Sequence, residues 1–532
     1  MISPRRPAPS TLGALPLLGL VLLPLAGMVL TWQRPPGLFD VPPIGFERIV
    51  PQMGRSLALA AIVCALSLVL GTWLAWVEHR TRYRGRAILG VLSMLPLAVP
   101  SYLLATIIRE VFAPNGWLGS PLGLTGRFTG FWPAVMVLTI SCVPYVHLLV
   151  GAALSRFPES VEEAARSLGA SPWRRFTALY VPHLRPAWSF AMVLVMLYVI
   201  SDFGAVAILD CEVLTWALYQ AQDYNAKDAV VMGFGLIVVV LPLLIGARRL
   251  QGRLQAERSV VVHRAGDRSP LAGLPLWGTW LLQGLLIGFG VILPVVALSV
   301  WLGKGLYYGV EFSEIWGPVF NTLLFSGVGA ALTIALALMP AWRAARPPRG
   351  PGSPDPLASI IEHGTYLTSA VPGVLVAFGI LQLVTALRAF EGGDGVSSGL
   401  EAAGVFLMLG YVMRFLAQGY GALKPGVLAM DLRQEEAARS LGAGPWRRLK
   451  AVALPALSPS IAAGSMLVFV SLMKELPITL MLAPLGHQQT LAFHIFDHSN
   501  ESALPDVGLA GLILLAVALT AQLLLLKWRR HA

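Results

Sequence analysis

Four polar or charged residues, which could bind water, an ion or a polar group, interrupt long apolar stretches of the 532-residue chain. Ser201 and Asp202 lie in one stretch, and Lys474 and Glu475 lie in another. A charge inside a membrane-length apolar segment is costly, so it usually faces the interior of a helix bundle or a watery cavity. We expect these residues to line a passage or its gate. The alternative role is a structural ion pair that locks two spans together.

A second group of chemically capable residues follows the later stretch. His487, His494, Asp497, His498 and Glu501 are all potential metal ligands. Their spacing matches no compact metal motif, and we expect the segment to be an exposed outer loop. We therefore predict no metal site in this chain, and we interpret the segment as a docking surface for a binding protein.

The elements that must position these residues are membrane helices. The chain is 56% hydrophobic and 13% charged, whereas a soluble domain has about 25% charged residues. A span needs roughly 20 apolar residues. We predict twelve spans, at 12–32, 56–77, 88–110, 131–154, 187–209, 229–247, 278–301, 321–342, 358–387, 402–420, 460–483 and 506–526. The fold class is therefore an all-α polytopic membrane protein.

Basic residues are concentrated in alternate connecting segments. The even-numbered loops and the C-terminal tail carry most of the Lys and Arg residues, and the odd-numbered loops carry few. The positive-inside rule then places the even loops and both termini in the cytoplasm. This topology accounts for the net charge of +11, so we do not expect nucleic-acid binding.

One cytoplasmic loop occurs twice in nearly identical form. Residues 162–175 read EEAARSLGASPWRR, and residues 435–448 read EEAARSLGAGPWRR. The chain is therefore two homologous six-span halves in a parallel repeat, with a pseudo-twofold axis along the membrane normal. The predicted parts are a first half at 1–247 with its loop at 155–186, a cytoplasmic linker at 248–276, and a second half at 277–532 with its loop at 421–459.

The repeat also relates the residues inside the spans. The spacing that aligns the two loops places Ser201 and Asp202 opposite Lys474 and Glu475. We therefore expect these two pairs of residues near the pseudo-twofold axis.

Each copy of the loop is predicted to be a short helix, a tight turn and a second short helix. Gly169 and Gly442 lie at helix C-cap positions that favour left-handed backbone. Pro182 and Pro455 are expected to end the second helix before the chain re-enters the membrane. Helix capping alone does not require such near-identity, so we interpret both loops as docking segments. Two identical docking segments imply a twofold partner.

The repeated loop resembles the EAA motif in permease subunits of bacterial ATP-binding-cassette importers. That motif has Glu-Ala-Ala, then a Gly, then a Leu-Pro-like pair. The matching residues are Glu163, Ala164, Ala165, Gly169 and Pro182 in the first loop, and Glu436, Ala437, Ala438, Gly442 and Pro455 in the second. Val181 departs mildly from the leucine of the motif.

The resemblance implies a fold, a location and partners. The fold is that of a type I importer permease in the bacterial inner membrane. The repeated loops would couple to a homodimeric ATP-binding-cassette ATPase, and a periplasmic binding protein would deliver the substrate. ATP and Mg would bind the ATPase, so this chain is expected to bind no cofactor. The chain lacks the Gly-x-x-x-x-Gly-Lys-Ser/Thr phosphate loop, and we predict that it is not an enzyme.

A finer resemblance concerns the substrate. Residues 474–482 read KELPITLML and residues 201–209 read SDFGAVAIL. These segments are similar to the paired segments of fused ferric-iron permeases, which implies Fe³⁺ as the substrate. Fused permeases for thiamine, phosphonate or polyamine share the architecture and stay as alternatives. An ion-gradient-driven secondary transporter is a more remote alternative, which the duplicated loop disfavours.

Overall fold

The computed structural model describes residues 14–33, 46–256, 269–345, 364–365, 371–391, 395–483 and 488–531. The regular secondary structure of these residues is helical except for a two-stranded parallel pairing of β1 (Thr81–Arg82) with β2 (Ser269–Pro270). Nine described helices are long and apolar enough to cross a membrane, and two bent helix pairs raise that number to as many as eleven. The shorter apolar segment Leu22–Gln33 coincides with the first predicted span. The predicted all-α polytopic fold is confirmed.

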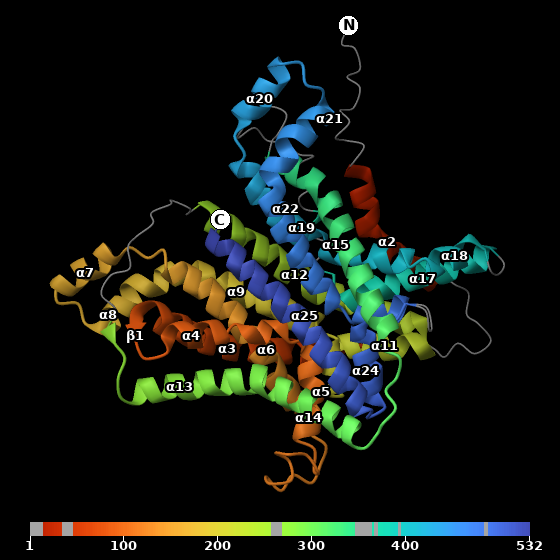
Figure 1. The fold of residues 1–532 in the computed structure, drawn as a ribbon, viewed down its shortest axis with the longest axis horizontal. Coiled ribbons are helices and arrows are strands. Elements are labelled where there is room, and N and C mark those ends of the chain that lie inside the picture. Colours follow the sequence, from red (N-terminus) through yellow and green to blue (C-terminus); the bar gives the residue numbers. More distant parts are fainter. Residues whose placement is uncertain are drawn as a thin grey trace.

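The helices before residue 257 run from red to yellow-green in Figure 1, and most of them pack together as a first bundle. They are α2 (Ala14–Gln33), α3 (Phe46–Arg80), α4 (Arg86–Leu92), the 3₁₀ turn η1 (Leu95–Ala98), α5 (Ser101–Val111), α6 (Phe131–Leu154), α7 (Glu159–Ser167), α8 (Pro172–Arg175), the π turn η2 (Phe176–Tyr180), α9 (Val181–Ser201), α10 (Gly204–Ile208), α11 (Leu214–Tyr224) and α12 (Ala226–Ala256).

The helices after residue 268 belong to the second half of the chain. They are α13 (Leu274–Ile287), the π turn η3 (Gly288–Ile292), α14 (Leu293–Tyr307), α15 (Trp316–Ala345), α17 (Gly373–Glu391), α18 (Val396–Ala402), α19 (Val405–Ala429), α20 (Leu432–Ser440), α21 (Pro445–Arg448), the π turn η4 (Leu449–Ala453), α22 (Leu454–Met473), α23 (Pro477–Leu482), α24 (Leu491–Asn500) and α25 (Leu504–His531).

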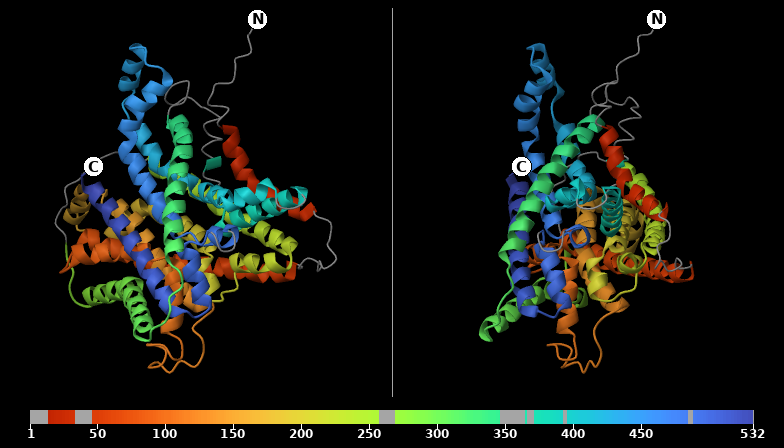
Figure 2. Two further views of the ribbon diagram at one scale, coloured as in Figure 1. Left: turned by 45° about the vertical axis from the view of Figure 1, so that its right-hand side comes forward. Right: turned by 90° about the vertical axis from the view of Figure 1, so that its right-hand side faces the viewer.

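The two bundles interlock through their first helices. Helix α2 packs on α17, and α13 and α14 lie against α3 and α5 (Figures 1 and 2). A Cβ atom on Gly27 of α2 would lie 1.9 Å from the carbonyl oxygen of Gly379 in α17, so only glycine permits this approach. The Thr31 hydroxyl of α2 also donates to Gln382 Oε1 of α17 at 3.0 Å. Each half therefore contributes packing surface that the other half needs.

Two of the predicted spans are bent rather than straight. In the third span, the segments Arg86–Ala98 and Ser101–Val111 meet at 97°; in the tenth, Val396–Ala402 and Val405–Ala429 meet at 65°. Pro100 has no N–H to continue a helix and takes an extended conformation at the first bend. Gly404 takes a left-handed conformation, with φ of 71°, at the second bend.

The prediction that Pro182 and Pro455 end a second loop helix is wrong. Each proline lies at the start of a long helix that continues directly from the loop, so Pro172–Ser201 and Trp446–Met473 are each one span-length helix. A π turn precedes the proline in both halves, at η2 and at η4. The wider turn leaves room for a ring that would clash with regular α-helical backbone.

The predicted linker is helical at its start, because α12 continues to Ala256. Residues 257–268 lie outside the described residues. Beyond them, β2 pairs with β1, and the Leu271 N–H donates to the Arg82 carbonyl at 3.1 Å. The end of the linker is therefore attached to the end of α3. The start of the ninth predicted span, at residues 358–363 and 366–370, also lies outside the described residues.

Candidate functional site

A polar cavity of about 290 Å³ lies where the broken helices of the two halves meet. Helix α9 ends at Ser201 and α22 ends at Met473, and each is followed by an irregular stretch and a short helix. Ser201, Asp202, Lys474 and Glu475 all line the cavity. The structure thus brings together the four intramembrane residues that the repeat places opposite one another.

Asp202 fixes the geometry of the first helix break. Its carboxylate accepts hydrogen bonds from the Ala205 N–H at 3.0 Å and from the Ser101 hydroxyl at 2.6 Å. Its carbonyl oxygen accepts from the Thr215 hydroxyl at 3.0 Å. Ser101 is the first residue of α5, directly after the bend at Pro100. Asp202 therefore joins the broken ends of two spans at the cavity wall.

Lys474 connects the two halves across the cavity. Its ammonium group donates to the Leu97 carbonyl of η1 at 2.9 Å. Among the ion pairs of the described residues, none joins Lys474 to Glu475 or to Asp202. The described residues therefore do not form the ion pair between two spans that was the alternative interpretation.

Glu475 carries an oxygen that the described residues leave without a hydrogen bond. Its Oε1 atom is buried and has no partner there. A Cβ atom on Gly373 would lie 2.7 Å from this oxygen, so the carboxylate is packed tightly against α17. A buried unpaired polar atom costs about 1–3 kcal/mol. Glu475 Oε1 is therefore available to contact a solute or a water molecule in the cavity.

Several cavity residues are absent from the sequence-based set. They are Ser101, Tyr102, Ser141, Tyr145, Tyr198, Arg414, Gln418 and Ser471. Arg414 donates to the Val371 carbonyl at 2.9 Å, and Gln418 donates to the Ser471 hydroxyl at 2.9 Å. Arg414 carried a signal that sequence reasoning missed, since it is a charge inside the predicted tenth span. The tyrosines carried none, because a tyrosine in an apolar stretch is ordinary.

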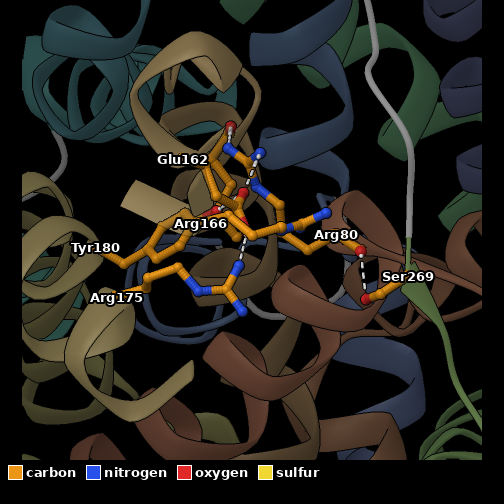
Figure 3. Close-up of polar contacts among 7 residues, drawn as sticks. Arg80, Glu162, Arg166, Arg175, Tyr180 and Ser269 are labelled. Atoms are coloured by element: carbon orange, nitrogen blue, oxygen red, sulfur yellow. Dashed lines mark hydrogen bonds and ion pairs between the residues drawn. The ribbon is translucent and has the colours of Figure 1, made fainter. Parts of the chain in front are cut away.

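The first repeated loop is fixed to the bundle through Glu162 (Figure 3). Its carboxylate accepts hydrogen bonds from Arg175 Nη1 at 3.1 Å and from the Tyr180 hydroxyl. It also forms ion pairs with Arg80 at 3.6 Å and with Arg166 at 3.5 Å. Arg80 is the last residue of α3, so Glu162 anchors the loop to a membrane helix.

The glutamates that match the motif, Glu163 and Glu436, are exposed and differ in this from Glu162. Ala164 and Ala437 are exposed as well, whereas Ala165 and Ala438 are half-buried. Sequence reasoning selected the second glutamate of each pair and missed the anchoring role of the first. Both glutamates are repeated in the second loop, and this repetition could have indicated that the first glutamate also has a role.

Replacing Glu162 by Gln is expected to loosen the first loop. The change removes the charge from bonds with Arg175 and Tyr180, and a hydrogen bond to a charged group contributes roughly 1.5–3 kcal/mol. We expect trypsin to cleave within the loop about tenfold faster, since cleavage follows the population of the opened loop. Glu163→Gln is the matched control and should leave the rate unchanged. Equal cleavage of both variants would contradict the anchoring role.

The second loop is packed against different side chains. Glu435 pairs with Arg448 at 3.8 Å. By the spacing of the repeat, Met430 and Ala453 occupy the positions of Phe157 and Tyr180, which stack on each other in the first half at 4.5 Å. A cavity of about 380 Å³ lies beside Met430 and Ala453. The two loops therefore share a sequence and differ in the side chains packed behind them.

Both loops present the same exposed surface after a glycine turn. Gly169 and Gly442 each have φ of 76°, so the predicted left-handed conformation is confirmed at both positions. Leu168 and Leu441 are each 86% exposed, and Trp173 and Trp446 are 73% and 74% exposed. Figure 1 shows the two loops, α7–α8 and α20–α21, projecting from the bundle at well-separated points. Exposed Leu and Trp side chains on a projecting loop are typical of a docking surface.

The segment after the second helix break is not the exposed loop that we expected. Residues 491–500 form α24, which packs against α25 and α5. His494 is buried, and burial lowers its pKa to about 4, with His498 adding to this effect. Asp497 and Glu501 are exposed, and His487 lies outside the described residues. The apolar face of this helix buries His494, which residue spacing alone did not reveal.

Comparison with known proteins supplies independent information. Residues 67–259 and 353–528, together more than half of the chain, match the family described as binding-protein-dependent transport system inner membrane component. The chain is 28% identical over 466 residues to the Fe(3+)-transport system permease protein FbpB 2 of Haemophilus influenzae, covering 86% of this chain and 85% of the relative.

Two further relatives match different shares of this chain. The ferric transport system permease protein FbpB of Actinobacillus pleuropneumoniae is 22% identical over 526 residues, which cover 91% of this chain and 72% of the relative. The sulfate transport system permease protein CysT of Escherichia coli is 27% identical over 258 residues, which cover 46% of this chain and 91% of the relative. The first relative matches almost the whole chain, and the second matches less than half of it.

Proposed function

The chain belongs to the family of binding-protein-dependent transport system inner membrane components, and we propose that both of its halves together form the import pathway for ferric iron. It is a multi-pass permease subunit of an ATP-binding-cassette importer. The observation that carries the proposal is the polar cavity at the two helix breaks, lined by Asp202 and Glu475 from opposite halves.

The lining of the cavity fits a small, hard cation. Hard cations prefer oxygen ligands, and the lining offers the carboxylates of Asp202 and Glu475 together with hydroxyl groups of tyrosine and serine. Two of these oxygens, Glu475 Oε1 and Tyr102 Oη, are buried without a partner among the described residues. The relatives that match most of this chain are named as ferric permeases, which also supports iron.

The cavity has room for a small hydrated cation. About 290 Å³ holds on the order of ten water molecules, each of which takes about 30 Å³. A metal ion with part of its hydration shell fits this space.

The two exposed loop surfaces support a twofold partner. The same leucine and tryptophan project from each loop, and identical surfaces bind identical sockets. We propose that a homodimeric ATPase binds both loops and carries the ATP and Mg, while this chain binds neither. A periplasmic binding protein would deliver iron at the opposite face. Purification of the chain with its ATPase should give one chain per ATPase dimer; an ion-gradient-driven transporter would bring down no ATPase.

The proposed topology has both termini in the cytoplasm of a bacterium and predicts which cysteines a membrane-impermeant reagent can reach. The native Cys64, Cys142 and Cys211 are all buried, so they should add little background labelling. Arg127→Cys should react in intact cells, and Arg84→Cys should react only after the membrane is permeabilised. Both native arginines are exposed, so access depends only on the side of the membrane. Labelling of Arg84→Cys in intact cells would contradict the topology.

A further inference from the structure

Three potential metal ligands from two helices converge outside the cavity. One ligand atom from each of His494, His498 and Asp506 lies within 4.8 Å of the other two. His494 and His498 are four residues apart on α24, and their rings stack with centroids 4.0 Å apart. Asp506 lies in the first turn of α25 and is buried. None of the three residues lines the cavity between the halves.

Ser313 lies at the centre of this cluster, in the segment between α14 and α15. Its Oγ atom is 2.6 Å from Asp506 Oδ1, 3.1 Å from His498 Nε2 and 3.4 Å from His494 Nε2. Its backbone N–H also donates to Asp506 Oδ1, at 2.8 Å. A fourth potential ligand atom, the Ser313 hydroxyl oxygen, is therefore held in contact with the other three.

The single hydrogen of the Ser313 hydroxyl cannot serve both Asp506 and His498 at once. His498 Nδ1 lies 2.9 Å from the His494 carbonyl and donates its hydrogen there, so the Nε2 atom of the neutral ring has a free lone pair. Ser313 has one hydroxyl hydrogen, which it can give either to Asp506 or to His498. The carboxylate adds a negative charge in a largely buried place. A cation would supply the positive charge that this arrangement lacks.

We propose that His494, His498 and Asp506 bind a divalent transition-metal cation, with the Ser313 hydroxyl or a water molecule as the fourth ligand. Two imidazoles and one carboxylate suit zinc or ferrous iron. The carbonyl bonded to His498 Nδ1 orients that ring in the way that outer partners orient metal-bound histidines. The donor set differs from the oxygen-rich cavity, so this is a separate site from the pathway for ferric iron.

A cation here would tie together parts of the chain that are distant in sequence. It would connect the segment before α15 to α24 and α25. The far end of α24 already bonds to the first half, because Arg109 Nη2 donates to the Ser499 carbonyl at 2.7 Å and the Thr106 hydroxyl lies 3.1 Å from the Ser499 hydroxyl. The site would thus stiffen a helix that contacts both halves.

Cobalt titration of the purified full-length chain tests the site, because tetrahedral Co²⁺ absorbs visible light. We expect saturable binding of one Co²⁺ per chain, displaced by Zn²⁺. His498→Gln and Asp506→Asn should each weaken binding at least tenfold. Asp497→Asn is the matched control, since Asp497 is an exposed carboxylate on the same helix, and it should bind like the wild type.

A variant that replaces one metal ligand by another distinguishes the loss of a ligand from a failure to fold. His498→Cys should still bind Co²⁺ and should add a thiolate-to-cobalt absorption band, which only a directly ligated metal gives. Absence of saturable binding by the wild type, or equal affinity in all variants, would show that the cluster is only a hydrogen-bonded network. A missing thiolate band in a folded, cobalt-binding His498→Cys protein would also overturn the assignment.

Discussion

Glu475→Gln is expected to reduce iron uptake by about tenfold or more while leaving the protein folded, a loss equivalent to about 1.4 kcal/mol in the barrier to transport. Glutamine keeps the shape of the side chain and removes the charge that faces the cavity. Oε1 of Glu475 has no hydrogen-bond partner among the described residues, and Arg414 donates to the Val371 carbonyl, so we expect the melting temperature to stay close to that of the wild type. The measurement is uptake per assembled complex, together with thermal unfolding of the purified variant.

The control for this prediction is Glu311→Gln, which removes an exposed carboxylate far from the cavity lining. It should change neither uptake nor melting temperature. Equal loss of complex and of uptake in Glu475→Gln would leave only a structural role for Glu475. Unchanged uptake would remove Glu475 from the pathway altogether.

Gly442→Val is expected to uncouple the second loop from its ATPase. The backbone at Gly442 has φ of 76°, where a side-chain-bearing residue loses roughly 1–2 kcal/mol. A Cβ atom there would meet no atom within 4 Å, so the cost is backbone strain and not a clash. If the loop must regain this conformation to dock, recruitment of the ATPase should weaken about 5- to 30-fold. Co-purification at limiting ATPase concentration measures this effect.

Gly442→Asn separates backbone strain from the addition of a side chain. Asparagine tolerates left-handed backbone better than other side-chain-bearing residues, so recruitment should stay close to wild type. The variant Gly169→Val should reproduce the defect in the first loop, where φ is also 76°. Normal recruitment in both valine variants would refute the docking role of the loops.

Features encoded locally could be predicted from the sequence. The turns at Gly169 and Gly442 depend on a few neighbouring residues, and the structure has them as expected. The meeting of Asp202 with Glu475 followed from the repeat, because a pseudo-twofold axis brings equivalent positions together. These are the parts of the fold that local propensity and internal symmetry determine.

Features that depend on distant residues could not be predicted. The anchoring of Glu162 needs Arg80 from α3 and Tyr180 from beyond the loop. The burial of His494 needs Asp506 and Ser313, which lie on other elements. The continuation of the loop helix through each proline depends on a π turn, which has no sequence signature of its own. Tertiary packing decides all of these.

The most direct test of the proposed function is uptake of Fe³⁺ into proteoliposomes that contain this chain and its ATPase. Uptake should require both ATP inside and the iron-loaded binding protein outside, and Glu475→Gln should abolish most of it without lowering assembly. Iron uptake driven by an imposed ion gradient in the absence of the ATPase would contradict the account.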